Sequence, residues 1–210
     1  MKLAPYPECK DSGVPWMGKI PAHWNVKPGL AFMSQRKEKN IGMKESTVLS
    51  LSYGQIVVKP PEKLHGLVPE SFETYQIANP GNIIIRGTDL QNDKTSLRVG
   101  KVRNRGIITS AYLCLEANDK INPDYIHLLL HGYDLMKVYY GMGSGLRQNL
   151  DFTDFKRLPI LAPSDSEQFQ IHKYIESVNA QITKFIRNKR RLIELLKEQK
   201  QNVINQAVTR

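Results

Sequence analysis

The chain has little cysteine, no long apolar run and no surplus of acidic residues. Its two cysteines are Cys9, near the start, and Cys114, inside an apolar stretch. This pattern supports neither a disulfide framework nor a zinc site, and it suits a reducing compartment. No apolar stretch approaches the roughly 18 residues of a membrane span, and no signal-peptide pattern opens the sequence. We therefore expect a soluble, cytoplasmic protein with no membrane partner.

Positive charge, by contrast, is plentiful. The 210 residues include 30 Lys and Arg against 20 Asp and Glu, a net charge of +10. Residues 166–210 alone carry nine basic and four acidic side chains. A balance of this kind favours polyanionic partners, nucleic acid first. The length allows one domain of about 150 residues plus one extended element.

The last forty or so residues carry apolar side chains at alternating spacings of four and three, from Ile171 to Val203. This period of 3.5 is typical of a coiled-coil seam, and a helix from Glu167 to Ala207 would be roughly 60 Å long. One helix cannot bury such a stripe alone, although a terminal helix packed on its own domain is the alternative. The seam positions that we expect at a dimer or subunit interface are Ile175, Val178, Ile182, Phe185, Lys189, Leu192, Leu196 and Val203.

The preceding sequence mixes strand and helix patterns. Residues 1–25 are rich in Pro, Gly and aromatic residues, and we expect an extended N-terminal arm held by Trp16 and Trp24. Further strands are predicted at 47–58 around a Tyr53-Gly54 turn, at 82–85 and at 107–116, and a helix from Asp124 to about Tyr140. The fold class is therefore a mixed α/β (α+β) globular domain over 26–163, followed by a long coiled-coil helix over 164–210.

Residues 86–105 form a polar connection between predicted strands. Its basic side chains are Arg86, Lys94, Arg98, Lys101, Arg103 and Arg105. So basic a segment is a poor core element, and we expect it to face phosphates. A merely solvated hairpin is the alternative.

Three fragments resemble catalytic or metal sites without completing one. Residues 122–125 approach the Asn-Pro-Pro-Tyr loop of adenine methyltransferases, but the second proline is missing and a helix cap explains the same residues. The glycines of 141–145 follow a predicted helix, whereas a dinucleotide loop links a strand to a helix. His127 and His131 are spaced to share a metal, but no third ligand lies nearby in sequence. We expect no catalytic residue and no metal ligand.

Four segments resemble specificity subunits of type I restriction-modification systems. Residues 10–24 (KDSGVPWMGKIPAHW) are similar to the opening of these subunits, and 106–112 (GIITSAY) to a strand of their target-recognition domains. Residues 143–150 (GSGLRQNL) resemble a polar loop near the domain end. The junction 158–163 (LPILAP) and the long helix ending in 202–209 (NVINQAVT) resemble the central conserved region.

The resemblance implies sequence-specific recognition of double-stranded DNA without catalysis by this chain. In the family, separate modification and restriction subunits methylate and cleave, so S-adenosylmethionine is expected on the modification subunit and no cofactor on this chain. Family members usually carry two recognition domains and two conserved helices, whereas this sequence has one of each. It is therefore a half-length subunit or half of a longer one. Two copies pairing their C-terminal helices antiparallel would form a homodimer that reads a bipartite palindrome.

On this basis we expect the loops to supply the base and phosphate contacts. The DNA-binding candidates are Tyr53, Arg86, Thr88, Asp89, Arg103, Arg105, Ser144, Arg147, Gln148 and Asn149. Arg can bind guanine O6 and N7, and Gln or Asn can bind adenine N6 and N7. Two other functions stay open: a basic coiled-coil adaptor without sequence-specific DNA binding, and a stand-alone DNA adenine methyltransferase.

Overall fold

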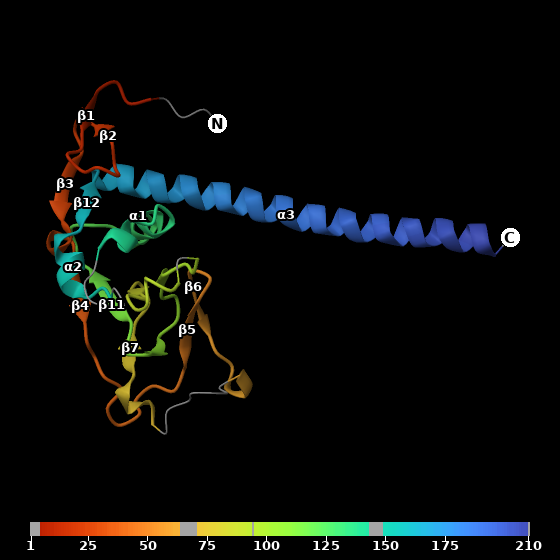
Figure 1. Ribbon diagram of the computed structural model, residues 1–210, viewed down its shortest axis with the longest axis horizontal. Coiled ribbons are helices and arrows are strands. Elements are labelled where there is room, and N and C mark those ends of the chain that lie inside the picture. Colours follow the sequence, from red (N-terminus) through yellow and green to blue (C-terminus); the bar gives the residue numbers. More distant parts are fainter. Residues whose placement is uncertain (1–4, 64–70, 94, 143–148, 210) are drawn as a thin grey trace. The chain divides into compact units, whose positions relative to one another are not determined.

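A computed structural model describes residues 5–63, 71–93, 95–142 and 149–209 (Figure 1). The chain divides into two compact units, Met1–Gln168 and Phe169–Arg210. The strands are β1 (Cys9–Asp11), β2 (Lys19–Pro21), β3 (Asn25–Pro28), β4 (Met33–Arg36), β5 (Leu49–Ser52), β6 (Gln55–Val58), β7 (Gln76–Ala78), β8 (Ile83–Ile85), β9 (Val99–Lys101), β10 (Gly106–Ile108), β11 (Leu113–Ala117) and β12 (Pro159–Ala162). The α-helices are α1 (Pro123–Leu135), α2 (Phe152–Arg157) and α3 (Asp165–Val208).

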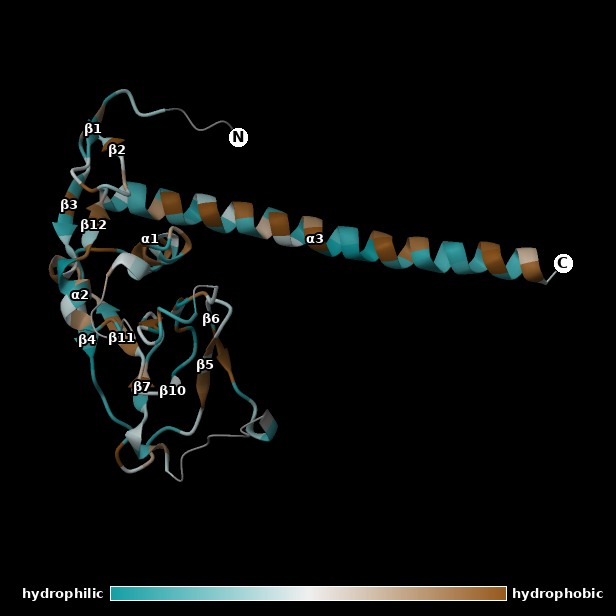
Figure 2. Cartoon of the chain, viewed as in Figure 1, coloured by the Kyte–Doolittle hydropathy of each residue, from teal (hydrophilic) through white to brown (hydrophobic). Residues whose placement is uncertain are grey.

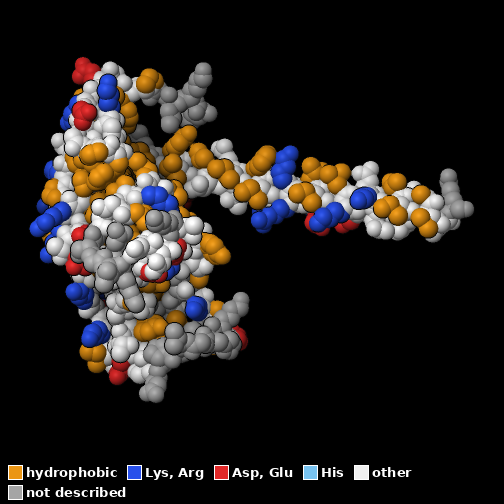
Figure 3. Space-filling model, in the orientation of Figure 1, with side chains coloured by type: hydrophobic (Ala, Val, Ile, Leu, Met, Phe, Trp, Pro, Cys, Tyr) orange, Lys and Arg blue, Asp and Glu red, His pale blue; other side chains and the backbone are white. Residues whose placement is uncertain are grey.

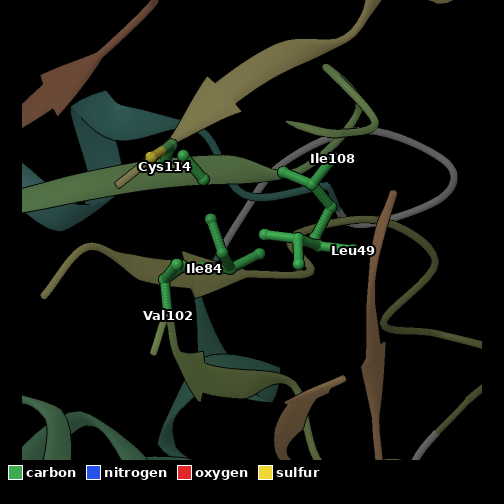
Figure 4. Close-up of a cluster of buried hydrophobic side chains, with 6 residues drawn as sticks. Leu49, Ile84, Val102, Ile108 and Cys114 are labelled. Carbon is green, nitrogen blue, oxygen red and sulfur yellow. The ribbon is translucent and has the colours of Figure 1, made fainter. Parts of the chain in front are cut away.

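A four-stranded antiparallel sheet in the order β4-β11-β8-β9 forms the centre of the first unit. The three isoleucines of β8 are all buried, as a strand covered on both faces requires. Ile84 packs with Leu49, Val102, Ile108 and the free thiol of Cys114 (Figure 4). The hairpin β5–β6, the pair β7–β10 and α1 surround this sheet. Antiparallel sheets with separate helices confirm the α+β class expected from the sequence.

Three local predictions need correction. The strand expected at 107–116 is two strands, because a turn closed by the Tyr112 N–H and the Thr109 carbonyl separates β10 from β11. The connection 86–105 contains β9, which pairs with β8. The helix expected to reach Tyr140 ends at Leu135, since Lys137 has a φ of +61° and a short 3-10 helix follows it.

The N-terminal segment is tied to the end of the same unit. Strands β1 and β2 form a hairpin, and β3 pairs with β12 across more than 130 residues of sequence. The ring of Trp16 packs edge-on against Tyr133, and the indole N–H of Trp24 donates to Glu167. The domain boundaries expected from the sequence remain a prediction.

Helix α3 begins with a capping box formed by Ser164 and Glu167. Glu167 accepts hydrogen bonds from the Ser164 N–H and hydroxyl, at 3.0 and 2.8 Å, and its own N–H donates to the Ser164 hydroxyl. Along the helix, apolar and polar residues alternate (Figure 2). Among the described residues, none of the helices combines the length and the apolar character that crossing a membrane requires.

Candidate nucleic-acid interface

The loop between β8 and β9 is built around a buried arginine. Arg98 is 1% exposed, although the sequence predicted a phosphate-facing side chain there, so this part of the prediction is wrong. Its guanidinium donates to the carbonyls of Arg86, Thr88 and Asp89, at 3.2, 2.7 and 3.1 Å, and also to the carbonyl of Asp93. A planar fork with five donors is the one side chain that can bind so many acceptors at once. The loop conformation is therefore fixed from inside.

Tyr140 and Asp134 also form hydrogen bonds that hold the loop around Arg98. The phenol of Tyr140 donates to the Asp93 carbonyl at 2.9 Å and accepts from Nε of Arg98 at 3.2 Å. The carboxylate of Asp134 accepts the backbone N–H of Arg98. Burial raises the pKa of Asp134 above its usual range, and the hydrogen bond from Arg98 only partly offsets this. A loop held by this many charge-assisted bonds changes shape little on binding.

The loop from β8 lies against the segment that precedes α2, some 60 residues further along the chain. The N–H of Asp89 donates to Oδ1 of Asn149 at 3.0 Å, and the N–H of Leu150 donates to the Gly87 carbonyl at 2.7 Å. A Cβ at position 87 would lie 2.5 Å from the Leu150 carbonyl oxygen, so glycine is required there. The fold thus joins two loops that the sequence predicted separately as DNA contacts.

Arg86 lies in the same loop but is already paired. Its guanidinium forms an ion pair with Asp93 at 3.0 Å. Hydrogen bonds from Ser96 and Thr95, together with this arginine, hold the pKa of Asp93 far below its usual range despite partial burial. A contact between Arg86 and DNA would have to share its guanidinium with this carboxylate, and the role predicted for Arg86 remains a prediction.

Tyr53 is at the tip of the β5–β6 hairpin, which rests beside the same loop. Both residues of the turn have positive φ, +48° for Tyr53 and +74° for Gly54. The Gly54 backbone packs so closely that a Cβ there would lie 3.1 Å from Leu97 and 3.3 Å from the His131 ring. Tyr53 itself is 91% exposed. The hairpin turn therefore adjoins the 86–97 loop and presents an aromatic ring to solvent.

The two other predicted arginines are at the opposite end of β9 from Arg98. Arg105 donates to the side-chain oxygen of Asn79 at 3.0 Å and lies 3.4 Å from the Glu45 carboxylate. Arg103 is exposed, and within the described ranges no hydrogen bond or ion pair engages its guanidinium. The fold consequently separates the predicted set into two groups: Tyr53, Arg86, Thr88, Asp89 and Asn149 at one end of the strand, and Arg103 and Arg105 at the other.

Helix α1 runs along β9 between these two groups. Its first turn is tied to the strand by the ion pair of Lys101 with Asp124. His127 and His131 stack with ring centroids 6.1 Å apart. Burial, then His131 and Lys101, lower the pKa of His127 to about 4, so this imidazole is neutral at physiological pH. In the part of the chain that the structure describes, no three His, Cys, Asp or Glu residues are placed to hold a metal ion.

Ser144, Arg147 and Gln148 lie outside the described residues. Asn149, the last of the four predicted contacts in this segment, is described and forms the bond to Asp89. The roles of Arg98 and Tyr140 in shaping the loop were not predicted from the sequence. The apolar Leu97, Val99 and Val102 around Arg98 were the available signal, because they indicate a partly buried strand.

The predicted seam lies entirely on the second unit, on helix α3. Ile182, Phe185, Leu192, Leu196 and Val203 are between 46 and 61% exposed in the single chain, and Ile175 and Val178 are half-buried. The ammonium group of Lys189 lies 5.3 Å from the centre of the Phe185 ring. Apolar side chains line much of the helix, with charged ones gathered near its middle (Figure 3). The second unit therefore carries an exposed amphipathic stripe.

The 86–97 loop and the segment around Asn149 present mainly uncharged hydrogen-bond donors and acceptors. Thr88 and Asp89 are half-buried, and Asn92 donates to the Asp89 carboxylate at 2.7 Å. Among the described residues, no hydrogen bond engages the NH₂ group of Asn149, and its amide oxygen has a second lone pair besides the one that accepts the Asp89 N–H. Donors and acceptors on a rigid loop suit the reading of base edges, whereas the exposed Arg103 suits a phosphate.

Three solved structures are similar to this chain. A solved structure described as the basis of complex assembly and conformational transition of the type I R-M system matches with a TM-score of 0.54 and 13% identity, covering 78% of this chain and 40% of that one. The crystal structure of the HsdS subunit from Thermoanaerobacter tengcongensis matches with a TM-score of 0.49 and 13% identity, covering 83% of this chain and 41% of that one. The crystal structure of the S subunit of a type I restriction-modification system from M. genitalium matches with a TM-score of 0.49 and 11% identity, covering 77% of this chain and 40% of that one.

The structure with the TM-score of 0.54 supports the fold described above. This chain spans less than half the length of each of the three solved chains. Among curated protein sequences, none matches this chain. The sequence model of the family described as "Type I restriction modification DNA specificity domain" matches residues 39–204, which include both joined loops and most of helix α3. The chain therefore belongs to the type I restriction-modification DNA specificity family.

Proposed function

We propose that this chain is a sequence-specific DNA-recognition subunit of a type I restriction-modification complex. It directs separate modification and restriction subunits to a bipartite, palindromic DNA site. The observation that carries the proposal is the joining of two distant loops by the bond between Asp89 and Asn149, on a scaffold fixed by Arg98, in a chain of the DNA specificity family. Rigid polar loops suit sequence reading, because a wrong base leaves their donors and acceptors without hydrogen-bond partners, and this weakens binding.

The division of labour follows from the side chains. Thr88, Asp89 and Asn149 offer acceptors and donors for base edges, and Arg103 and Arg105 offer charge for the phosphate backbone. Each well-placed bidentate contact contributes about 1 to 3 kcal/mol of discrimination. Methylation and cleavage are assigned to the partner subunits, with S-adenosylmethionine bound by the modification subunit.

The long helix pairs two copies of the chain, so that the second copy reads the second half-site. In the proposal, two copies pair their α3 helices antiparallel through the seam around Phe185, Leu192 and Leu196. The twofold axis then places one recognition unit at each end, so the DNA site is a gapped palindrome. With 44 residues, α3 is about 66 Å long, and this length sets the spacing between the half-sites. The polar Lys189 within the seam favours one register.

Selection of bound duplexes from a random-sequence pool tests the proposal directly. The purified 210-residue chain should enrich a gapped palindrome, and light scattering should give twice the chain mass of 24.0 kDa. Enrichment without a common sequence would contradict sequence reading and favour a basic adaptor. Transfer of a methyl group to DNA by the chain alone would contradict the non-catalytic role.

A further inference from the structure

Tyr53 occupies a backbone conformation that does not suit it. The register pairs Ser52 with Gln55, so Tyr53 and Gly54 form a two-residue turn in which both φ angles are positive. Turns of this type favour Asn-Gly, because most L residues other than Asn and Asp are strained in the left-handed region. Local folding therefore disfavours tyrosine at this position.

Packing does not explain the tyrosine either. Its 91% exposure exceeds that of every other large apolar side chain among the described residues. The inner face of the hairpin carries Leu49 and Ile56, which join the core. The ring of Tyr53 contributes little to that core, so the fold gains no burial in return for the strain.

The tip is nevertheless held firmly. The Gly54 backbone rests on Leu97, at the end of the loop that Arg98 organises, and on His131 of α1. Strand β6 also contacts β9 of the central sheet. The aromatic ring therefore projects from a supported turn, which lowers the entropy lost when it binds a partner.

The surroundings of the ring match nucleic acid better than protein. Strand alternation places Ser50, Ser52 and Gln55 on the outer face, with Val57 as its one apolar member. A single aromatic ring on a polar face lacks the apolar patch of a protein-binding surface. A nucleic-acid base offers a flat π-face to one ring, and stacking on it does not require an apolar surround.

We propose that Tyr53 is a stacking wedge, whose ring inserts beside a base and partly unstacks one step of the bound duplex. This inference rests on the DNA-recognition function proposed above and adds a mechanism to it: part of the sequence preference comes from how easily that step opens. The strain at position 53 is kept because no residue suited to the turn could supply the ring.

The test uses variants that separate stacking from folding. Tyr53→Asn fits the left-handed turn, so it should unfold at the same temperature as the wild type or a few degrees higher. It should bind the selected duplex roughly 5- to 150-fold more weakly, the loss expected for one stacked base. Tyr53→Phe keeps the ring and should bind as the wild type does. Val57→Thr, an exposed change on the same outer face, is the matched control and should also bind normally.

Unstacking is read from 2-aminopurine placed at each adenine of the selected duplex in turn. The wild type and Tyr53→Phe should raise the fluorescence at one step, and Tyr53→Asn should not. Unchanged affinity and fluorescence with Tyr53→Asn would overturn the wedge while leaving sequence recognition intact. A lower unfolding temperature of Tyr53→Asn, or a Tyr53→Phe variant as weak as Tyr53→Asn, would also overturn it. If the wild type selects no common sequence, the wedge and the proposed function both fail.

Discussion

The indole N–H of Trp24 donates a hydrogen bond to the carboxylate of Glu167 at 3.1 Å, which ties the N-terminal segment to the first turn of helix α3. The same carboxylate oxygen lies 2.7 Å from Nε2 of His23, and the ring of Tyr6 packs against both His23 and Trp24. One glutamate thus caps the helix and anchors a segment more than 140 residues away in sequence.

Glu167 should make stability depend on pH in the acid range. Partial burial alone would raise its pKa, but hydrogen bonds from Trp24, His23 and Ser164 outweigh burial and lower the pKa from 4.5 to about 2. A depressed carboxyl pKa stabilises the fold above pH 4.5, and this stabilisation is lost as the pH falls towards 2. Denaturant titrations between pH 5 and 2 should show a loss of up to about 3 kcal/mol that Glu167→Gln lacks. Glu176→Gln on α3 is the control and should keep the wild-type pH profile.

Arg98→Met should destabilise the protein and remove its sequence preference together. The substitution removes the guanidinium donor from four loop carbonyls. The carbonyls of Asp89 and Asp93 keep a second donor, the Asp93 N–H and the Tyr140 phenol, so the main loss is at Arg86 and Thr88. We expect the free energy of unfolding to fall by about 3 kcal/mol. Arg98→Lys keeps the charge but cannot reach all four acceptors, so its stability and its sequence preference should lie between those of the wild type and those of Arg98→Met. Chemical denaturation gives the first readout, and binding to the selected duplex relative to random duplex gives the second. A Met variant that retained full discrimination would show that the loop does not depend on Arg98.

Arg103→Ala should weaken binding to selected and random duplex by the same factor. An exposed guanidinium free to meet phosphate contributes charge without sequence information, so the slope of log affinity against log salt should fall by about one. Lys27→Ala removes the same charge from exposed strand β3 and should leave the slope unchanged. A loss confined to the selected duplex would assign Arg103 to a base.

Leu196→Glu should convert a dimer into a monomer without unfolding the first unit. A carboxylate at this exposed seam position would be buried and unpaired in a helix pair, which is strongly unfavourable. Gln201→Glu adds the same group on the face opposite the seam and should leave the mass unchanged. Light scattering across a range of concentrations measures both. Equal masses for the two variants would exclude this seam as the interface.

Local sequence patterns predicted what depends on near neighbours. The 3.5-residue period of the seam and the Tyr53-Gly54 turn both involve residues within a few positions of one another. Such features follow from helix geometry and turn chemistry before any tertiary contact forms. The family resemblance, based on segments along the chain, was likewise confirmed by the match over residues 39–204.

Which polar side chains face inward and which loops meet depends on contacts between distant parts of the chain. Arg98 is buried because the surrounding loop turns four carbonyls towards it, and composition shows only a basic residue in a basic segment. Asp89 and Asn149 meet because the long-range strand pairings bring their loops together, which no short-range period encodes. The long helix, the hairpin turn and the family could be predicted from local sequence patterns. The arrangement of the candidate interface depends on burial and on hydrogen bonds between distant segments, which exist only once the chain has folded.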